Sequence, residues 1–207
     1  MSAVKKRNPV SVEDYLAGEL VSAVKHEYLG GVVYAMAGAC NAHNLIASNV
    51  LIALGGRLRG RRCRLYNSDT KVRIRLPHQV RFYYPDASVI CRPNPQQDSY
   101  QDEPAVIMEV VSSSTRRADE GEKKDAYLTI PSLCVYLIIE QESPTVVVHR
   151  RTEQGFVREV YEDLDAVISL AEIETELPLA EAYDGVEFVP ERQDEAFSAE
   201  QQPSTTL

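Results

Sequence analysis

The apolar run at residues 106–111 contains one charged residue, Glu109. Near-continuous apolar sequence predicts a strand covered on both faces, as in the middle of an α/β sheet. A carboxylate in such a strand is costly unless it is paired, protonated or bound to a metal ion. Glu109 lies near the carboxyl end of the run, and open α/β sheets bind ligands at that end of their strands. The pattern therefore predicts a functional site around Glu109.

The rest of the chain alternates helical and extended patterns. Helical spacing or capping signals predict helices at 11–18 with Ser11 as N-cap, from Asn41 or Asn44 to 58, at 115–130, and as a last turn at 177–183. Extended patterns predict strands at 25–29, 32–36, 63–66, 71–76, 82–91, 133–140, 145–151, 156–161 and 166–170. Together these elements predict an α/β fold, with a flexible lead at 1–10, one folded domain at 11–190 and a disordered polar tail at 191–207.

Composition narrows the class of protein. The chain has 207 residues, 44% of them apolar and 26% charged, which is typical of a globular domain. No run of apolar residues is long enough to span a membrane, so we expect none. The net charge of -9 excludes a protein that coats nucleic acid through charge alone, although a local basic groove stays compatible with it. The four cysteines form no C-x-x-C pair, which predicts free thiols in a reducing compartment and a cytoplasmic location.

Arginines gather at the end of the predicted helix 41–58, in the stretch 57–64. One interpretation is a solvated helix C-terminus, where cations are favourable next to the helix dipole. The other is a patch that contacts phosphates. The spacing alone favours the first. His43, before the same helix, is by its position a capping or packing residue.

The candidate chemistry lies in Asp86, Glu109, Asp119 and Lys123. Two acids at neighbouring strand ends are able to bind a hard dication, and a nearby lysine is able to orient water or stabilise charge on a phosphate. Asp119, Lys123 and Tyr127 are four residues apart and share one helix face. Pro85 places Asp86 at a strand end or bulge. The alternative is a structural ion pair between Glu109 and Lys123 or Arg116, and spacing does not separate the two.

A set of short motifs adds to this reading. The motifs are Tyr84-Pro85-Asp86, the run 106–111, the hydroxyl and arginine run 112–117, Asp119 with Gly121-Glu122-Lys123, and Tyr127. In these spacings the chain resembles the Uma-two family of restriction-endonuclease-like proteins, within the PD-(D/E)xK nuclease-like superfamily. Flanking features are similar too: Glu27 before Gly30-Gly31, the His43-Asn44 helix start and Ser68-Asp69. The likeness covers about residues 10–190 and implies a mixed central sheet flanked by helices, with an N-terminal helix and hairpin extension.

The resemblance also implies roles for particular residues. Asp86 and Glu109 match the two acids of the superfamily, which would bind Mg²⁺ or Mn²⁺ with the Val110 carbonyl as a third ligand. The superfamily lysine falls at position 111, where this chain has Val111. Lys123, from the following helix, is the matching replacement.

Other residues would assist. Glu27, Asp119 and Tyr127 are accessory candidates, and Arg116 and Arg117 are candidates for phosphate contacts.

The function that the resemblance implies is a metal-dependent endonuclease acting on nucleic acid, with DNA as the expected substrate and a homodimer as the expected assembly. The alternative is a non-catalytic dimerising or nucleic-acid-binding module with a decayed site. The acidic net charge and Val111 favour the module, whereas Asp86, Glu109 and Lys123 favour the enzyme.

Overall fold

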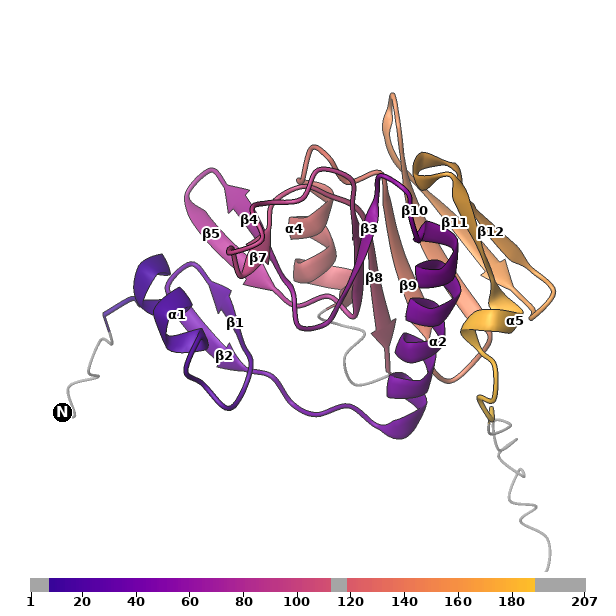
Figure 1. Cartoon of the computed structure of the whole chain (residues 1–207), viewed down its shortest axis with the longest axis horizontal. Coiled ribbons are helices and arrows are strands. Elements are labelled where there is room, and N and C mark those ends of the chain that lie inside the picture. Colours follow the sequence, from indigo (N-terminus) through magenta and orange to yellow (C-terminus); the bar gives the residue numbers. More distant parts are fainter. Residues whose placement is uncertain (1–7, 113–118, 189–207) are drawn as a thin grey trace, which may run out of the picture.

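The computed structural model describes residues 8–112 and 119–188, which form a mixed α/β structure (Figure 1). Within these residues a large sheet has the strand order β11 (Gly155–Glu162), β10 (Thr145–Thr152), β9 (Val135–Glu140), β8 (Pro104–Val111), β6 (Ala87–Ile90) and β3 (Arg64–Asn67). An N-terminal sheet has the order β2 (Val32–Ala35), β1 (His26–Leu29), β5 (Gln79–Tyr83), β4 (Lys71–Leu76) and β7 (Tyr100–Gln101). The strands β12 (Val167–Leu170) and β13 (Thr175–Pro178) pair with each other.

Helices cover these sheets. They are α1 (Val12–Glu19), α2 (Asn41–Leu58), the π-helical turn η1 (Asp119–Lys123), α4 (Lys124–Leu128), the 3-10 turn η2 (Ala171–Ile173) and α5 (Leu179–Ala182). No helix in the described ranges is both long and apolar enough to cross a membrane.

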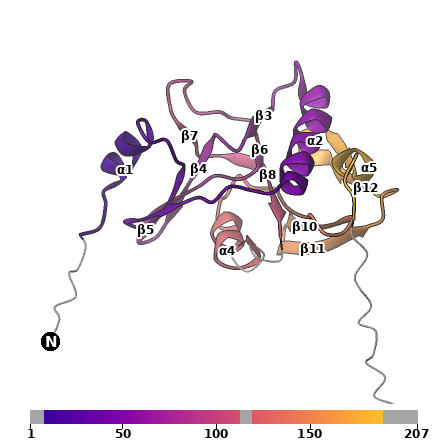
Figure 2. The same ribbon diagram turned by 90° about the horizontal axis from the view of Figure 1, so that it is seen from below.

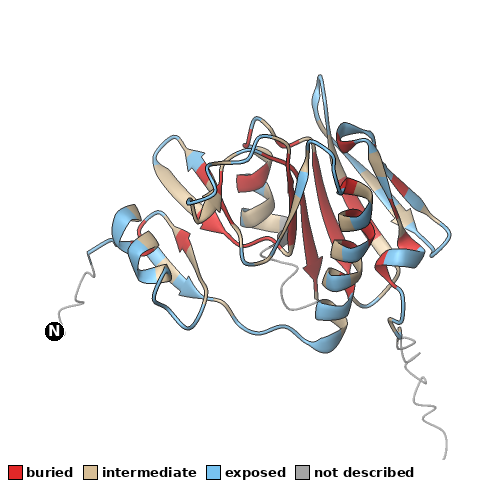
Figure 3. Cartoon of the chain, viewed as in Figure 1, coloured by how far each residue is buried: buried red, intermediate tan, exposed pale blue. Residues whose placement is uncertain are grey.

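The large sheet is mixed, as the family resemblance predicts. Strands β8 and β9 run parallel, with Val106 opposite Val135, while β6 runs antiparallel to β8. Every residue of β8 is buried, which matches its near-continuous apolar sequence. Figure 3 shows β8 and β9 as the buried centre of the molecule, and Figure 2 shows α2 and α4 on opposite sides of that centre.

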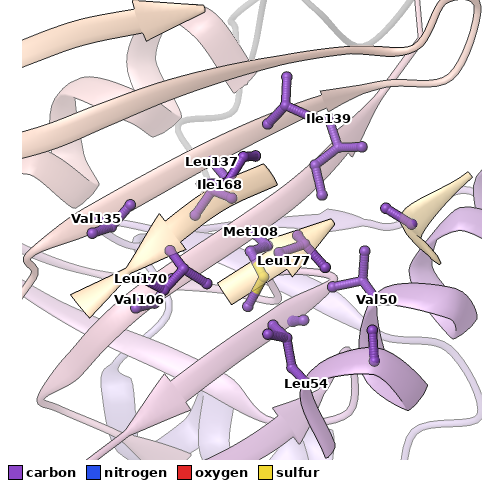
Figure 4. Packing of buried hydrophobic residues seen from close by; sticks show 14 of the residues in the cluster. Val50, Leu54, Val106, Met108, Val135, Leu137, Ile139, Ile168, Leu170 and Leu177 are labelled. Carbon is purple, nitrogen blue, oxygen red and sulfur yellow. The ribbon is translucent and has the colours of Figure 1, made fainter. Parts of the chain in front are cut away.

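Side chains of β8 alternate between two cores because successive residues of a strand face opposite sides. Met108 and Val110 pack in the core that includes α2. Ile107 and Val111 pack in the core that includes Tyr127 of α4. Glu109 therefore belongs to the α4 side of the sheet. Figure 4 shows side chains of the α2 core.

The N-terminal extension is the predicted helix followed by a hairpin. The Ser11 side chain accepts a hydrogen bond from the Asp14 amide and so caps α1. Tyr15 of α1 packs on Tyr28 and Phe82, with ring centroids 5.0 and 5.3 Å away. This packing attaches α1 to the N-terminal sheet.

The stretch 82–91, predicted as one strand, forms parts of two strands in different sheets. β5 ends at Tyr83 and β6 begins at Ala87. Pro85 lacks an amide hydrogen and cannot continue the ladder, so the chain leaves one sheet there and enters the other. Asp86 therefore lies at the junction of the two sheets.

Three other boundaries differ from the prediction. Cys40, whose side chain makes no capping hydrogen bond, is the N-cap of α2 in place of Asn41 or Asn44. The predicted helix 115–130 is η1 followed by α4, and its residues 115–118 lie outside the described ranges. The predicted turn 177–183 is the end of β13 followed by α5.

The expectation of four free thiols is wrong. Cys63 and Cys91 form a disulfide, while Cys40 and Cys134 are free. The reason is the antiparallel pairing of β3 with β6, which places Arg64 opposite Ile90. The cysteines are the next pair outward, with their Cα atoms 3.9 Å apart. Their separation of 28 residues along the chain conceals this proximity.

Breaking this bond should destabilise the fold. The cross-link closes a loop spanning 28 residues, and the loss of that constraint on the unfolded chain should lower the free energy of unfolding by about 3–4 kcal/mol. Urea unfolding with and without reductant measures the change. Cys40→Ser is the control, and its unfolding midpoint should change with reductant as that of wild type does. Cys63→Ser should unfold at a lower urea concentration, and reductant should not change its midpoint further. An unchanged wild-type midpoint under reductant would contradict the assignment.

Candidate active site

The candidate site lies where the carboxyl end of β8 meets β1, α4 and η1. Glu109 is 3% exposed. Its Oε1 accepts a hydrogen bond from the Tyr127 hydroxyl at 3.1 Å and lies 3.1 Å from Lys123 Nζ. The Lys123 ammonium and the Tyr127 hydroxyl thus compensate the burial of this carboxylate, as a buried charge requires.

Lys123 joins two carboxylates. Its Nζ lies 3.2 Å from Glu27 Oε1 as well as 3.1 Å from Glu109 Oε1. The ammonium also lies 5.6 Å from the centre of the Tyr83 ring, within the range of a cation–π contact. Lys123 therefore projects from the end of η1 toward the acids, on the same side of the sheet as Tyr127.

Tyr127 is fully buried beneath this group of charges. Burial, together with the negative charges of Glu109 and Glu27, raises the pKa of Tyr127 well above its ordinary value. The phenol therefore stays protonated and donates to Glu109. This contact fixes the orientation of the carboxylate.

Asp86 also lies at the carboxyl end of β8, where the Val110 backbone and the His43 side chain contact its carboxylate. Its Oδ2 accepts a hydrogen bond from the Val110 amide at 2.7 Å and lies 3.2 Å from His43 Nε2. His43 stands in the first turn of α2, so α2 contributes directly to the site. Reading His43 as a capping or packing residue missed this contact. In the sequence, the contact between His43 and Asp86 is indicated by nothing more than a histidine at the start of a predicted helix.

The structure thus brings Asp86 and Glu109 to one strand end through different contacts. Asp86 binds the backbone of Val110, whereas the Glu109 side chain contacts Lys123 and Tyr127. Asp86 precedes the first residue of β6, and its carboxylate is held by the Val110 amide, so it does not share the neighbours of the Glu109 side chain. Convergence of both acids, with the Val110 carbonyl, on one ion stays a prediction.

Three other predicted residues are not placed at the site. Asp119 begins η1, but its side chain lies outside the described part of the chain, and Arg116 and Arg117 lie outside it entirely.

The donors present suit a hard dication. Within residues 8–112 and 119–188 no three His, Cys, Asp or Glu side chains form a group that could hold a metal ion. Mg²⁺, however, is commonly bound through only one or two carboxylates together with water and substrate phosphate. Glu27 Oε1 is buried, and in the described chain it lacks a hydrogen bond of good geometry despite its ion pair with Lys123. The carboxylate oxygens of Asp86 and Glu109 and the backbone carbonyl of Val110 are oxygen donors of the kind that Mg²⁺ takes.

A second polar cluster supports the chain just before Asp86. The Tyr84 hydroxyl donates to Glu19 at 2.7 Å and accepts from buried Lys71 at 3.2 Å. Burial acts to raise the pKa of Glu19, but hydrogen bonds from Tyr84 and His26 outweigh it and hold that pKa below its ordinary value. Burial lowers the pKa of Lys71. This cluster links α1 to the segment that carries Asp86.

Comparisons with known proteins agree with the motifs. The family model of Uma2, described as "Putative restriction endonuclease", matches residues 12–180. The uncharacterized protein slr1290 of Synechocystis sp. is 31% identical over 147 residues, which cover 70% of this chain and 76% of the relative. The uncharacterized protein sll1609 of the same organism is 30% identical over 144 residues, covering 68% and 80%.

A solved structure shows the same fold. It is a protein from Anabaena variabilis described as a putative nuclease belonging to DUF820. The TM-score is 0.62 at 17% sequence identity, over 78% of this chain and 91% of that one. The match of both sequence and fold is consistent with the predicted nuclease-like architecture, and the chain belongs to the Uma2 family.

Proposed function

We propose that this protein is a metal-dependent endonuclease that hydrolyses phosphodiester bonds in DNA. The observation that carries the proposal is buried Glu109, paired with Lys123 and adjacent in sequence to the residue that holds Asp86. The ion pair alone also fits a structural role. Its position at the end of the central strand, in a chain of the Uma2 family, favours catalysis.

Different residues of the chain would bind the metal ion and position its ligands. Asp86, Glu109 and the Val110 carbonyl would hold Mg²⁺ or Mn²⁺, and Tyr127 would keep Glu109 in position. When bound, the dication supplies charge neutralisation at the phosphoryl oxygens and acidifies a water molecule.

Hydrolysis forms a bond from a water oxygen to phosphorus and breaks the bond to the leaving sugar oxygen, and the proton that the water loses is balanced by one that the sugar oxygen gains. Lys123 would stabilise the charge that develops on the phosphoryl oxygens, taking the role of the lysine absent at Val111. Glu27 would hold the ammonium from its other side. The expected homodimer stays a prediction.

Incubation of the purified protein with supercoiled plasmid tests the proposal. We expect nicking with Mg²⁺ or Mn²⁺ and none with a chelator, and calorimetry should show metal binding in the absence of DNA. RNA of the same sequence is the substrate control. If the protein shows no nicking and calorimetry shows no metal binding, the proposal is overturned in favour of the non-catalytic module.

A further inference from the structure

An open groove runs between the C-terminal half of α2 and strand β3. Its volume is about 730 Å³, and its lining includes Leu51, Arg59, Arg61, Arg64 and Tyr66. β3 is the outermost strand of the large sheet and, among the described residues, pairs only with β6. The groove is therefore bounded by a helix on one side and a sheet edge on the other.

Positive charge is concentrated here although the chain carries a net charge of -9. Arg57 is neutralised by Glu181 at 2.6 Å, and Arg61 lies 3.4 Å from Glu174. Arg59 and Arg64 are exposed and form no ion pair with any residue in the described ranges. Two arginine side chains on the groove thus keep their charge available.

The helix dipole does not account for both of them. α2 ends at Leu58 with Arg59 as its C-cap, and a dipole effect is confined to the last turn of a helix. Arg64 lies beyond that end, in β3. A solvated helix C-terminus therefore explains Arg59 at most, and Arg64 is an exposed charge on an edge strand.

β3 leads from these arginines to the candidate site. Asn67, at its other end, pairs with Ala87, the residue after Asp86. Three residues of strand, from Arg64 to Asn67, span roughly 10 Å. Leu65 packs against the core that includes α2, so Arg64 and Tyr66 share the other face of β3, where both line a second hollow of about 590 Å³.

We infer that this groove holds the phosphate backbone of a nucleic acid extending from the site at Asp86, an inference that rests on the proposed function. Arginine forks bind phosphate oxygens in pairs, and the Tyr66 ring on the same strand face as Arg64 offers a surface on which a base stacks. An acidic protein segment would match the charge but would make no comparable use of Tyr66. Continuity with the candidate site also favours the nucleic acid.

Binding measured without cleavage tests this inference. The variant Arg59→Gln/Arg64→Gln removes both available charges, and Arg75→Gln/Arg158→Gln removes two charges that line neither hollow. Fluorescence anisotropy of a labelled DNA duplex, with chelator present to prevent cleavage, gives the affinity. The groove variant should bind about tenfold more weakly or worse, and the slope of log K against log salt should be shallower by about 2. The control should stay within about threefold of wild type.

The outcomes separate this inference from the proposed function. Equal losses in both variants, or wild-type affinity in the groove variant, would overturn the inference even if plasmid is nicked. Absence of duplex binding by wild type would also overturn it, as would stronger arginine-dependent binding of a polyglutamate peptide than of DNA. Arginine-dependent binding without cleavage would support the groove and count against the nuclease. Circular dichroism and thermal midpoints check that each variant is folded.

Discussion

Replacing Glu109 by glutamine should abolish metal-dependent nicking of plasmid DNA. Glutamine keeps the shape and one carbonyl oxygen, so Tyr127 still has an acceptor. It removes the negative charge that would attract the dication, and metal affinity should fall with it. We expect no cleavage above background at any manganese concentration, together with loss of the calorimetric signal. Asp86→Asn should have the same effect, because Asp86 is the other carboxylate that would hold the ion.

Contaminating nuclease is the main source of a false result. Cleavage by Glu109→Gln equal to that of wild type would mean that the activity belongs to a contaminant or to another site. Thermal unfolding should accompany the assay, because Glu109→Gln removes an acid that lies 3.1 Å from the Lys123 ammonium.

Lys123→Ala provides a contrasting result within the same experiment. The lysine would act on the reacting groups, so cleavage should slow by roughly 10²- to 10³-fold while metal binding is largely kept. Lys124→Ala, one residue further along, removes the same charge and is the matched control. If both variants cleave as wild type does, the assignment of Lys123 is wrong and the ion pair is structural.

Much of the architecture follows from local pattern. The run 106–111 is buried on both faces because its apolar residues leave no face for water. Spacing of four residues placed Lys123 and Tyr127 on one face, and both side chains contact Glu109. These predictions succeed because helical and extended periodicity are determined by neighbouring residues.

The features that the sequence did not reveal depend on pairing between distant segments. The Cys63–Cys91 bond depends on β3 pairing with β6, and the contact of His43 with Asp86 depends on where α2 packs. The division of 82–91 between two sheets follows from Pro85 at their junction. Pro85 was recognised as an interruption, but the sheet that each half would join is a property of the whole fold.

The second large effect that we expect is a loss of stability when a buried side chain of α2 is truncated. Leu54 is 0% exposed and belongs to the core that packs α2 against the large sheet, as Figure 4 shows, whereas Ile52 on the same helix is 74% exposed. Leu54→Ala removes a buried side chain and leaves a cavity, which should lower the free energy of unfolding by about 3–5 kcal/mol. Ile52→Ala removes a similar volume from the surface and should change it by no more than about 0.5 kcal/mol.

Urea unfolding followed by circular dichroism compares the two variants, and the slope with denaturant concentration should stay the same in both. The same helix carries His43 in its first turn, so a loosened α2 should also weaken the support of Asp86. Leu54→Ala should therefore reduce nicking more than its folded fraction alone accounts for, while Ile52→Ala should leave nicking unchanged. Equal stability of the two variants would show that α2 does not pack on the sheet through this face.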